Sequence, residues 1–197
     1  HFRTLGSIGS VMKILRRDYR PKDLSVFVLP FFRLLARPRK SVNLALTKAS
    51  ALLKLERSLG LPINIHLEPS GDCHFHCIKC GRNSTSYADD GAMGKGKFLP
   101  FDLFKAIMDE LGDTLISVRL WHFGESLLNK DLPRMIAYAR TKGVIVALST
   151  SLTPFDEKRA EDIIRAGLDY VIVSFDGASR ETYLRYHGLD RYDQVLD

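Results

Sequence analysis

Short apolar runs alternate with longer amphipathic stretches from residue 63 to the end of the chain. Apolar runs bounded by turn residues predict strands, whereas apolar residues that recur every three or four positions predict helices. The predicted strands cover residues 63–67, 117–122, 144–148 and 170–175. The predicted helices begin at the capping residues Asp102, Asp131, Asp156 and Ser179, and the first three end at Gly112, Gly143 and Gly167. This alternation predicts βα units around a parallel sheet.

The same pattern indicates where a ligand would bind. Residues 144–148 and 171–173 are almost continuously apolar, which is typical of strands covered on both faces. The segments that follow the strands are instead rich in glycine and polar residues, and they span residues 68–80, 123–126, 149–153 and 174–176. Because the carboxyl ends of parallel strands lie at one edge of a sheet, we expect these segments to form one site.

Residues 1–60 differ in charge from the rest of the chain. They hold thirteen Lys and Arg residues against three Asp and Glu, whereas the remainder holds 16 and 20. Their apolar residues recur near helical spacing before a stop signal at Gly60 and Pro62, and those residues are Leu44, Leu46, Ala49, Leu52, Leu53 and Leu59. We therefore expect a basic, mainly helical extension over 1–60 and an α/β domain over 61–197. A solvated helical segment is the favoured interpretation of the extension, and contact with an acidic partner, a nucleic acid or a membrane surface is the alternative.

The composition is that of a soluble globular protein, with 45% hydrophobic and 26% charged residues. No apolar run reaches the ~18–20 residues that a membrane-spanning helix needs, and the first residues do not resemble a secretory signal. The three cysteines are clustered and odd in number, which does not fit a secreted disulfide framework. Thiols available for a metal are typical of a reducing compartment, so we expect a cytoplasmic protein.

The cysteines carry the chemistry that the sequence indicates most clearly. Cys73, Cys77 and Cys80 follow the spacing Cys-x3-Cys-x2-Cys within one short loop. Thiolates are the ligands of iron–sulfur clusters. Three of them would leave one iron of a [4Fe–4S] cluster open to a substrate or cofactor. A zinc site with His74 or His76 as its fourth ligand is the alternative, although no second ligand couplet is present.

Beyond the cysteines, residues 63–197 resemble the radical S-adenosylmethionine (SAM) superfamily. The matching segments are residues 67–70 before the cysteine motif, then residues 123–126, 148–150, 174–177 and 181–183. The resemblance implies a partial (β/α)6 barrel, of which this chain would hold about four βα units before it stops inside the fourth helix. It is nearest to the branch whose members often carry a C-terminal SPASM-type domain.

The resemblance also implies a function. Cys73, Cys77 and Cys80 would bind a [4Fe–4S] cluster whose open iron is chelated by SAM. Reductive cleavage of SAM would then give a 5′-deoxyadenosyl radical that takes hydrogen from an unidentified peptide, sugar or small metabolite. An electron donor such as flavodoxin or ferredoxin is implied as a partner. The sequence identifies no catalytic residue that acts on the substrate. A non-catalytic iron–sulfur or regulatory protein on the same fold is the alternative function.

Seven further residues are expected to contact SAM by the same resemblance. Gly124 and Glu125 would hold its amino group, while Thr150 and Ser174 would contact its carboxylate or ribose. Ser149 and Asp176 lie near them in sequence, and the backbone of Lys79 would lie near the adenine. Several positions depart from the usual pattern of the family, and they are Lys79, Phe123, Ser126, Ser151, Leu152 and His187, with Arg185 as a possible substitute for the arginine that His187 replaces.

Overall fold

The computed structural model of the chain describes residues 37–83 and 96–196. The first 36 residues of the predicted basic extension therefore lie outside the described residues. No helix in the described ranges is long and apolar enough to cross a membrane.

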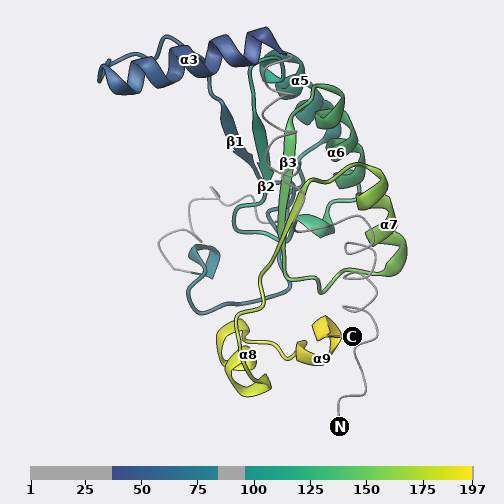
Figure 1. Cartoon of the computed structure of the whole chain (residues 1–197). Helices are drawn as coiled ribbons and strands as arrows, with labels where there is room; N and C mark the ends of the chain where they lie inside the picture. Colours follow the sequence, from purple (N-terminus) through teal and green to yellow (C-terminus); the bar gives the residue numbers. More distant parts are fainter. Residues whose placement is uncertain (1–36, 84–95, 197) are drawn as a thin grey trace, which may run out of the picture.

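Four parallel strands form the centre of the fold (Figure 1). They are β1 (Asn64–Leu67), β2 (Ser117–Leu120), β3 (Ile145–Thr150) and β4 (Tyr170–Val173). Each strand pairs in parallel with the next one along the chain, so their order in the sheet is β1-β2-β3-β4. This sequential order is the winding of a barrel, whereas a doubly wound sheet reverses its order at a switch point. The α/β fold and its parallel sheet, with the winding of a partial barrel, are confirmed.

Three helices cover one face of the sheet. Figure 1 shows α5 (Phe101–Leu111), α6 (Leu132–Thr141) and α7 (Glu157–Arg165) along the same side of the strands. Alternate residues of β2 and β3 point into this layer and are fully buried, namely Val118, Leu120, Val146 and Leu148. They pack with Phe104, Met108, Leu132, Met135, Ile136, Ala139 and Ile163 of the helices. The core therefore lies between the sheet and this helical layer.

The helix boundaries agree with the predicted capping residues at some ends and not at others. The Asp156 side chain accepts a hydrogen bond from the backbone N–H of Arg159, so it caps α7 as expected. Helix α5 instead begins directly after Pro100, and Asp102 lies inside its first turn without capping it. Pro100 occupies the N-cap position with an extended backbone and offers no side-chain acceptor.

Strand β4 corrects the prediction that it is covered on both faces. All four of its residues are exposed, from Val171 at 37% to Tyr170 and Ile172 at 51%. In the described chain β4 has a single neighbour, β3, and lies at the edge of the sheet. Its apolar run indicates that this strand is built for burial, but the described residues do not provide the covering layer.

Helix α3 (Pro38–Leu52) packs against the domain through polar residues. Its buried residues are polar, namely Lys40, Asn43 and Ser50, while Leu46, Leu52, Leu53 and Leu59 are exposed. The Lys40 ammonium donates to the carbonyls of Gly112 and Leu115, at the end of α5. Asn43 binds the backbone of Leu61 through its amide and carbonyl groups. Hydrogen bonds, rather than the leucines, hold this helix against the domain.

The last described elements follow β4. Ser179 caps α8 (Arg180–His187) in a reciprocal capping box with Thr182, as its position predicts. The helix ends at Gly188, which has a φ of 72°, and a short helix, α9 (Tyr192–Leu196), follows. The prediction that the chain stops inside this helix is therefore wrong. In Figure 1, α8 lies at the end of the sheet where the strands finish, opposite α3.

Candidate active site

One cavity at the carboxyl ends of the strands contains the three cysteines and the seven residues expected to contact SAM. It has a volume of about 330 Å³. Its lining includes the three cysteines together with Lys79, Gly124, Glu125, Ser149, Thr150, Ser174 and Asp176. The structure brings these ten residues together because the ends of parallel strands meet at one edge of the sheet. The role of each residue toward a ligand stays a prediction.

The cysteine loop is attached to two neighbouring elements through its backbone. The N–H of Glu125, at the end of β2, donates to the carbonyl of Asp72 at 2.6 Å. On the other side, the N–H groups of His76 and Ile78 donate to the last carbonyls of α8, from His187 and Tyr186, at 3.1 and 3.0 Å. Helix C-termini leave such carbonyls without intrahelical partners. The loop between the first two cysteines and the segment after Cys77 are therefore fixed by α8.

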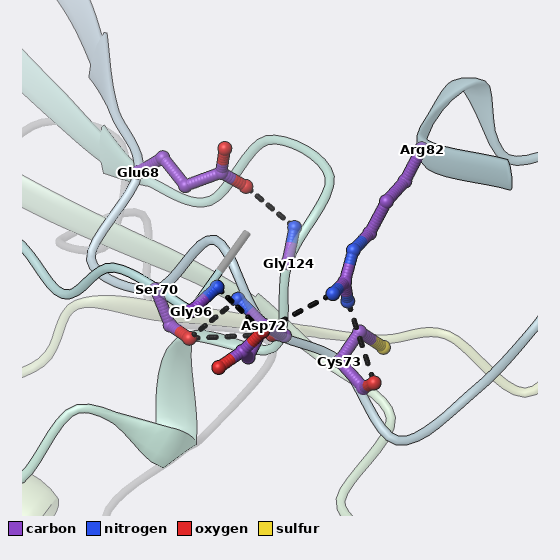
Figure 2. A network of polar contacts seen from close by, with 7 residues as sticks. All are labelled: Glu68, Ser70, Asp72, Cys73, Arg82, Gly96 and Gly124. Carbon is purple, nitrogen blue, oxygen red and sulfur yellow. Dashed lines mark hydrogen bonds and ion pairs between the residues drawn. The ribbon is translucent and has the colours of Figure 1, made fainter. Parts of the chain in front are cut away.

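Polar side chains fix the start of the same loop (Figure 2). Asp72 accepts from the Arg82 guanidinium at 3.2 Å and from the backbone N–H of Gly96 at 2.9 Å. Arg82 also donates to the carbonyl of Cys73 at 3.3 Å, so it joins the two ends of the cysteine loop. The Arg82 side chain is only 10% exposed. An ion pair in this setting orients the loop more than it would at the surface.

Gly124 lies where no other residue would fit. A Cβ atom at this position would meet the carbonyl oxygen of Ser70 at 1.8 Å. Its backbone N–H, like that of Phe123, donates to the Glu68 carboxylate, as Figure 2 shows for Gly124. The glycine is therefore required by the close approach of the β1 and β2 ends, before any ligand is considered.

Glu125 is buried and already has a full set of partners. It is 3% exposed. One carboxylate oxygen accepts from the Thr150 hydroxyl at 2.7 Å and the Leu127 N–H at 3.1 Å. The other accepts from the Ser151 N–H at 2.9 Å and the Ser151 hydroxyl at 2.7 Å. An ionised carboxylate has about four acceptor positions. Glu125 therefore joins the ends of β2 and β3, and the Thr150 hydroxyl is committed to the same bond.

Other predicted residues keep their polar groups available to the cavity. The hydroxyls of Ser149 and Ser174 lie 3.3 Å apart across the ends of β3 and β4. The Asp176 side chain is 49% exposed, with its carboxylate 3.8 Å from the ring of His187. Lys79 is exposed and lines the cavity, whereas Arg185 is exposed and does not line it. Ser149, Ser174 and Asp176 therefore retain capacity for a ligand that Glu125 and Thr150 lack.

His187 contacts one of the cysteines from behind. It is 2% exposed, and its Nδ1 lies 3.2 Å from Cys77 Sγ. Its ring packs against Tyr183 and Phe75, with centroids 4.2 and 4.8 Å apart. Burial lowers the pKa of His187, and the Asp176 carboxylate opposes that shift. The ring is therefore held in its neutral form beside a cysteine by a buried aromatic cluster.

The cysteines suit a group with several metal atoms. Burial raises the pKa of the Cys77 thiol to about 11, and the neighbouring Cys73 and Cys80 add to this shift. A bound metal would replace the thiol protons. Among the described residues, no three Cys, His, Asp or Glu side chains are arranged to hold a single ion. His74 and His76 are exposed and do not line the cavity. Three thiolates around one cavity fit a cluster, which offers a separate iron to each, better than a single zinc ion.

Comparison with known protein families identifies the superfamily of this chain. The family model described as Radical SAM superfamily matches residues 67–197. The chain belongs to the radical SAM superfamily. Membership in this superfamily implies a [4Fe–4S] cluster and SAM as cofactors, and the chemistry of the three cysteines fits that cluster.

Two relatives illustrate what this radical SAM chain is similar to. Over 117 residues it is 35% identical to an Fe-coproporphyrin III synthase of Methanosarcina barkeri, covering 59% of this chain and 28% of that protein. Over 132 residues it is 31% identical to a PqqA peptide cyclase of Bradyrhizobium diazoefficiens, covering 64% and 33%. The chain therefore spans about a third or less of the length of these relatives. A crystal structure of BtrN with AdoMet and 2-DOIA matches with a TM-score of 0.49 and 23% identity, over 66% of this chain and 54% of that one.

Sequence reasoning missed several residues of this radical SAM site. Ser151 supplies two of the four hydrogen bonds to Glu125. Trp121 and His122 line the cavity beside Phe123, at the end of β2. Ser151 and His187 were noted only as departures from the family pattern. The run of aromatic residues 121–123 was the one local signal for this part of the cavity lining. The roles of Ser151 and His187 instead depend on contacts with residues distant in sequence.

Proposed function

We propose that this chain forms the SAM-cleaving part of a radical SAM enzyme, with Cys73, Cys77 and Cys80 holding a [4Fe–4S] cluster. When bound, the cluster and SAM supply a one-electron cleavage that gives a 5′-deoxyadenosyl radical, which takes a hydrogen atom from the substrate. The observation that carries this proposal is the cavity that the three cysteines share with the ends of β2, β3 and β4.

The residues around the cavity divide into two groups by what their polar atoms already contact. Glu125 and Thr150 bind each other and the backbone, so we propose that they position the strand ends rather than contact SAM directly. Ser149, Ser174 and Asp176 have capacity left for the polar groups of SAM, and a carboxylate suits an ammonium. Gly124 brings the β2 end close to the loop, and the backbone of Lys79 is proposed to lie near the adenine.

The substrate and the partners belong to the same proposal. The relatives are named for a porphyrin synthase and a peptide cyclase, which supports a peptide or a small molecule as the substrate. A flavodoxin or ferredoxin is proposed as the electron donor. Contact of the basic extension with an acidic partner or a membrane surface, and a place in the cytoplasm, stay predictions.

A cleavage assay tests the function. The purified chain is reconstituted anaerobically with iron and sulfide, reduced with dithionite and incubated with SAM, and 5′-deoxyadenosine is measured by mass spectrometry. We expect 5′-deoxyadenosine from the wild type, background levels from the Cys73→Ala/Cys77→Ala/Cys80→Ala variant and wild-type levels from His74→Ala, the loop control. A protein that holds a full, reducible cluster and forms no 5′-deoxyadenosine would instead be the non-catalytic iron–sulfur protein, and the proposal would be wrong.

A further inference from the structure

The sheet has a second face that the helices do not cover. Residues on this face alternate with the buried residues of the core, and in β1 and β2 they are Asn64, His66, Ser117 and Arg119. His66 pairs in register with Arg119, and Arg119 pairs with Ala147 of β3. The small side chain of Ala147 leaves room beside the arginine. Arg119 therefore lies on the inner side of the sheet, away from the helical layer, and is exposed in the described chain.

The Arg119 side chain makes one hydrogen bond to a described residue, and that residue is not an acid. Its Nη1 donates to Nε2 of His66 at 2.9 Å. A guanidinium can only donate, so Nε2 must be the acceptor and the ring proton lies on Nδ1. Trp121 packs edge-on against the His66 ring, with centroids 5.6 Å apart. The pair is therefore oriented, and the guanidinium retains most of its five N–H donors.

Six of the other described arginines differ from Arg119 because each has a carboxylate partner, whereas Arg37, Arg57, Arg159, Arg185 and Arg191 have none either. Those with a carboxylate partner are Arg39, Arg82, Arg134, Arg140, Arg165 and Arg180. Arg119 forms no ion pair in the same residue ranges. The guanidinium fork matches a carboxylate or phosphate in two parallel hydrogen bonds. Arg119 is thus a cation with unused donors, held beside His66 by a hydrogen bond.

The position of this pair connects it to the active-site cavity. Trp121 lines the cavity and follows Arg119 by two residues, just past the end of β2. Two residues of a strand span roughly 7 Å. Ser149 and Ser174 also line the cavity. They lie at the ends of β3 and β4 on the same face of the sheet as Arg119. Arg119 and His66 therefore lie about two residues along the sheet from the proposed SAM site. A substrate bound beside SAM would reach this region.

We propose that Arg119 and His66 bind an anionic group of the substrate, a carboxylate or a phosphate. The identification of the ligand as the substrate rests on the proposed function, whereas the binding of an anion rests only on the Arg119–His66 pair. The proposal narrows the substrate to a molecule that carries such a group within reach of the cavity.

The single tryptophan of the chain gives a direct test, because Trp121 contacts His66. Fluorescence is followed while the purified chain, without iron or SAM, is titrated with glutarate, with inorganic phosphate and with glutaramide as the uncharged match of glutarate. Total ionic strength is held constant with chloride. We expect a saturable change with at least one anion and none with glutaramide. The tighter of the two anions identifies the group as carboxylate or phosphate.

Two variants and a control assign the signal. Arg119→Gln should weaken anion binding at least tenfold, and Arg119→Lys should weaken it less because the charge remains. Arg134→Gln, an exposed arginine on α6, should bind as the wild type does. Because Arg119 is exposed, these variants should keep the urea midpoint of the wild type. Equal binding by wild type and Arg119→Gln, or no saturable response to either anion, would overturn the proposal. Neither result depends on SAM cleavage, so this proposal and the proposed function fail separately.

Discussion

At the residue scale, the buried Glu125 carboxylate should contribute more to stability than a carboxylate at the surface. Its carboxylate accepts four hydrogen bonds while 3% exposed. Glu125→Gln places an NH2 group against protein donors, so we expect a loss of roughly 2 kcal/mol in the free energy of unfolding. Glu110→Gln, on the exposed side of α5, should change it by less than about 0.5 kcal/mol. Urea unfolding measures both, and equal losses would contradict the buried network.

His187 makes a second prediction at this scale, on the cluster itself. With Cys77 as a thiolate, His187 Nδ1 at 3.2 Å can only be a favourable contact as a donor. Hydrogen bonds to cluster sulfurs raise the reduction potential. His187→Phe keeps a ring in the aromatic cluster and removes the donor, so we expect a potential more negative by on the order of 60 mV, a tenfold change in the equilibrium constant of a one-electron step.

The control for His187 keeps the donor and removes the ring. His187→Asn places an amide N–H near the position of Nδ1, and its potential should stay close to that of the wild type. Redox titration followed by EPR measures each value. If His187→Phe has the wild-type potential, or if both variants shift equally, the contact does not act through its hydrogen bond.

These residues also show how far the sequence led at this scale. Ten of the residues that line the cavity could be predicted because cysteine spacing and strand ends are local signals. The SAM contact expected of Glu125 stays a prediction, whereas its protein partners Thr150, Leu127 and Ser151 were not predicted, and two of these lie at the end of the next strand. A side chain's partners depend on the register of β2 and β3, which no local pattern encodes.

At the scale of elements, α3 shows why one helix end could not be predicted. Lys54 has a φ of 51°, and the N–H of Leu55 donates to the carbonyl of Ser50. This is the arrangement in which a glycine usually follows the helix. Because a lysine occupies the left-handed position, the leucine pattern predicted a helix that continues toward Leu59. Which face of α3 is buried could not be predicted either, because its polar residues bind backbone carbonyls of a segment distant in sequence.

Lys40 makes a prediction about how α3 is held. Burial, with a smaller effect of Arg37, lowers the pKa of Lys40 from 10.5 to about 8. Between these values the unfolded chain holds a proton that the folded chain has released, so stability rises with pH in this window, by at most about 1.4 kcal/mol per pH unit. Lys40→Met removes this contribution. The difference in unfolding free energy between wild type and Lys40→Met should therefore grow in favour of the wild type from pH 8 to 10.

The exposed Lys48 on the same helix provides the control. Lys48→Met should keep a constant difference from the wild type across this range. Taking differences removes the opposite effect of Cys77, whose raised pKa lowers stability as pH rises above about 9. Urea unfolding at pH 8, 9 and 10 measures all three proteins. Parallel curves for wild type and Lys40→Met would show that Lys40 titrates normally.

At the scale of the whole molecule, α3 and the cysteine loop lie at opposite ends of the sheet. Figure 1 shows α3 where the strands begin and α8 where they end. The cysteine loop joins the second end alone, through the N–H of His76 and Ile78 to α8 and through Asp72 to the end of β2. The order of the strands was predictable from the alternation of elements. The attachment of the loop to α8 was not, because it uses backbone groups that any sequence carries.

This arrangement predicts where cluster loading acts. A group that binds the folded chain and not the unfolded one raises stability, and it does so most where it adds contacts. Loading should therefore slow amide hydrogen exchange in the cysteine loop and in α8, and leave α3 within about twofold of the iron-free protein. Exchange followed by mass spectrometry, with and without iron and sulfide, measures both ends in one sample. Equal protection of α3 and α8 would mean that loading stabilises the molecule as a single unit, and unchanged α8 would mean that its contacts with the loop do not transmit binding.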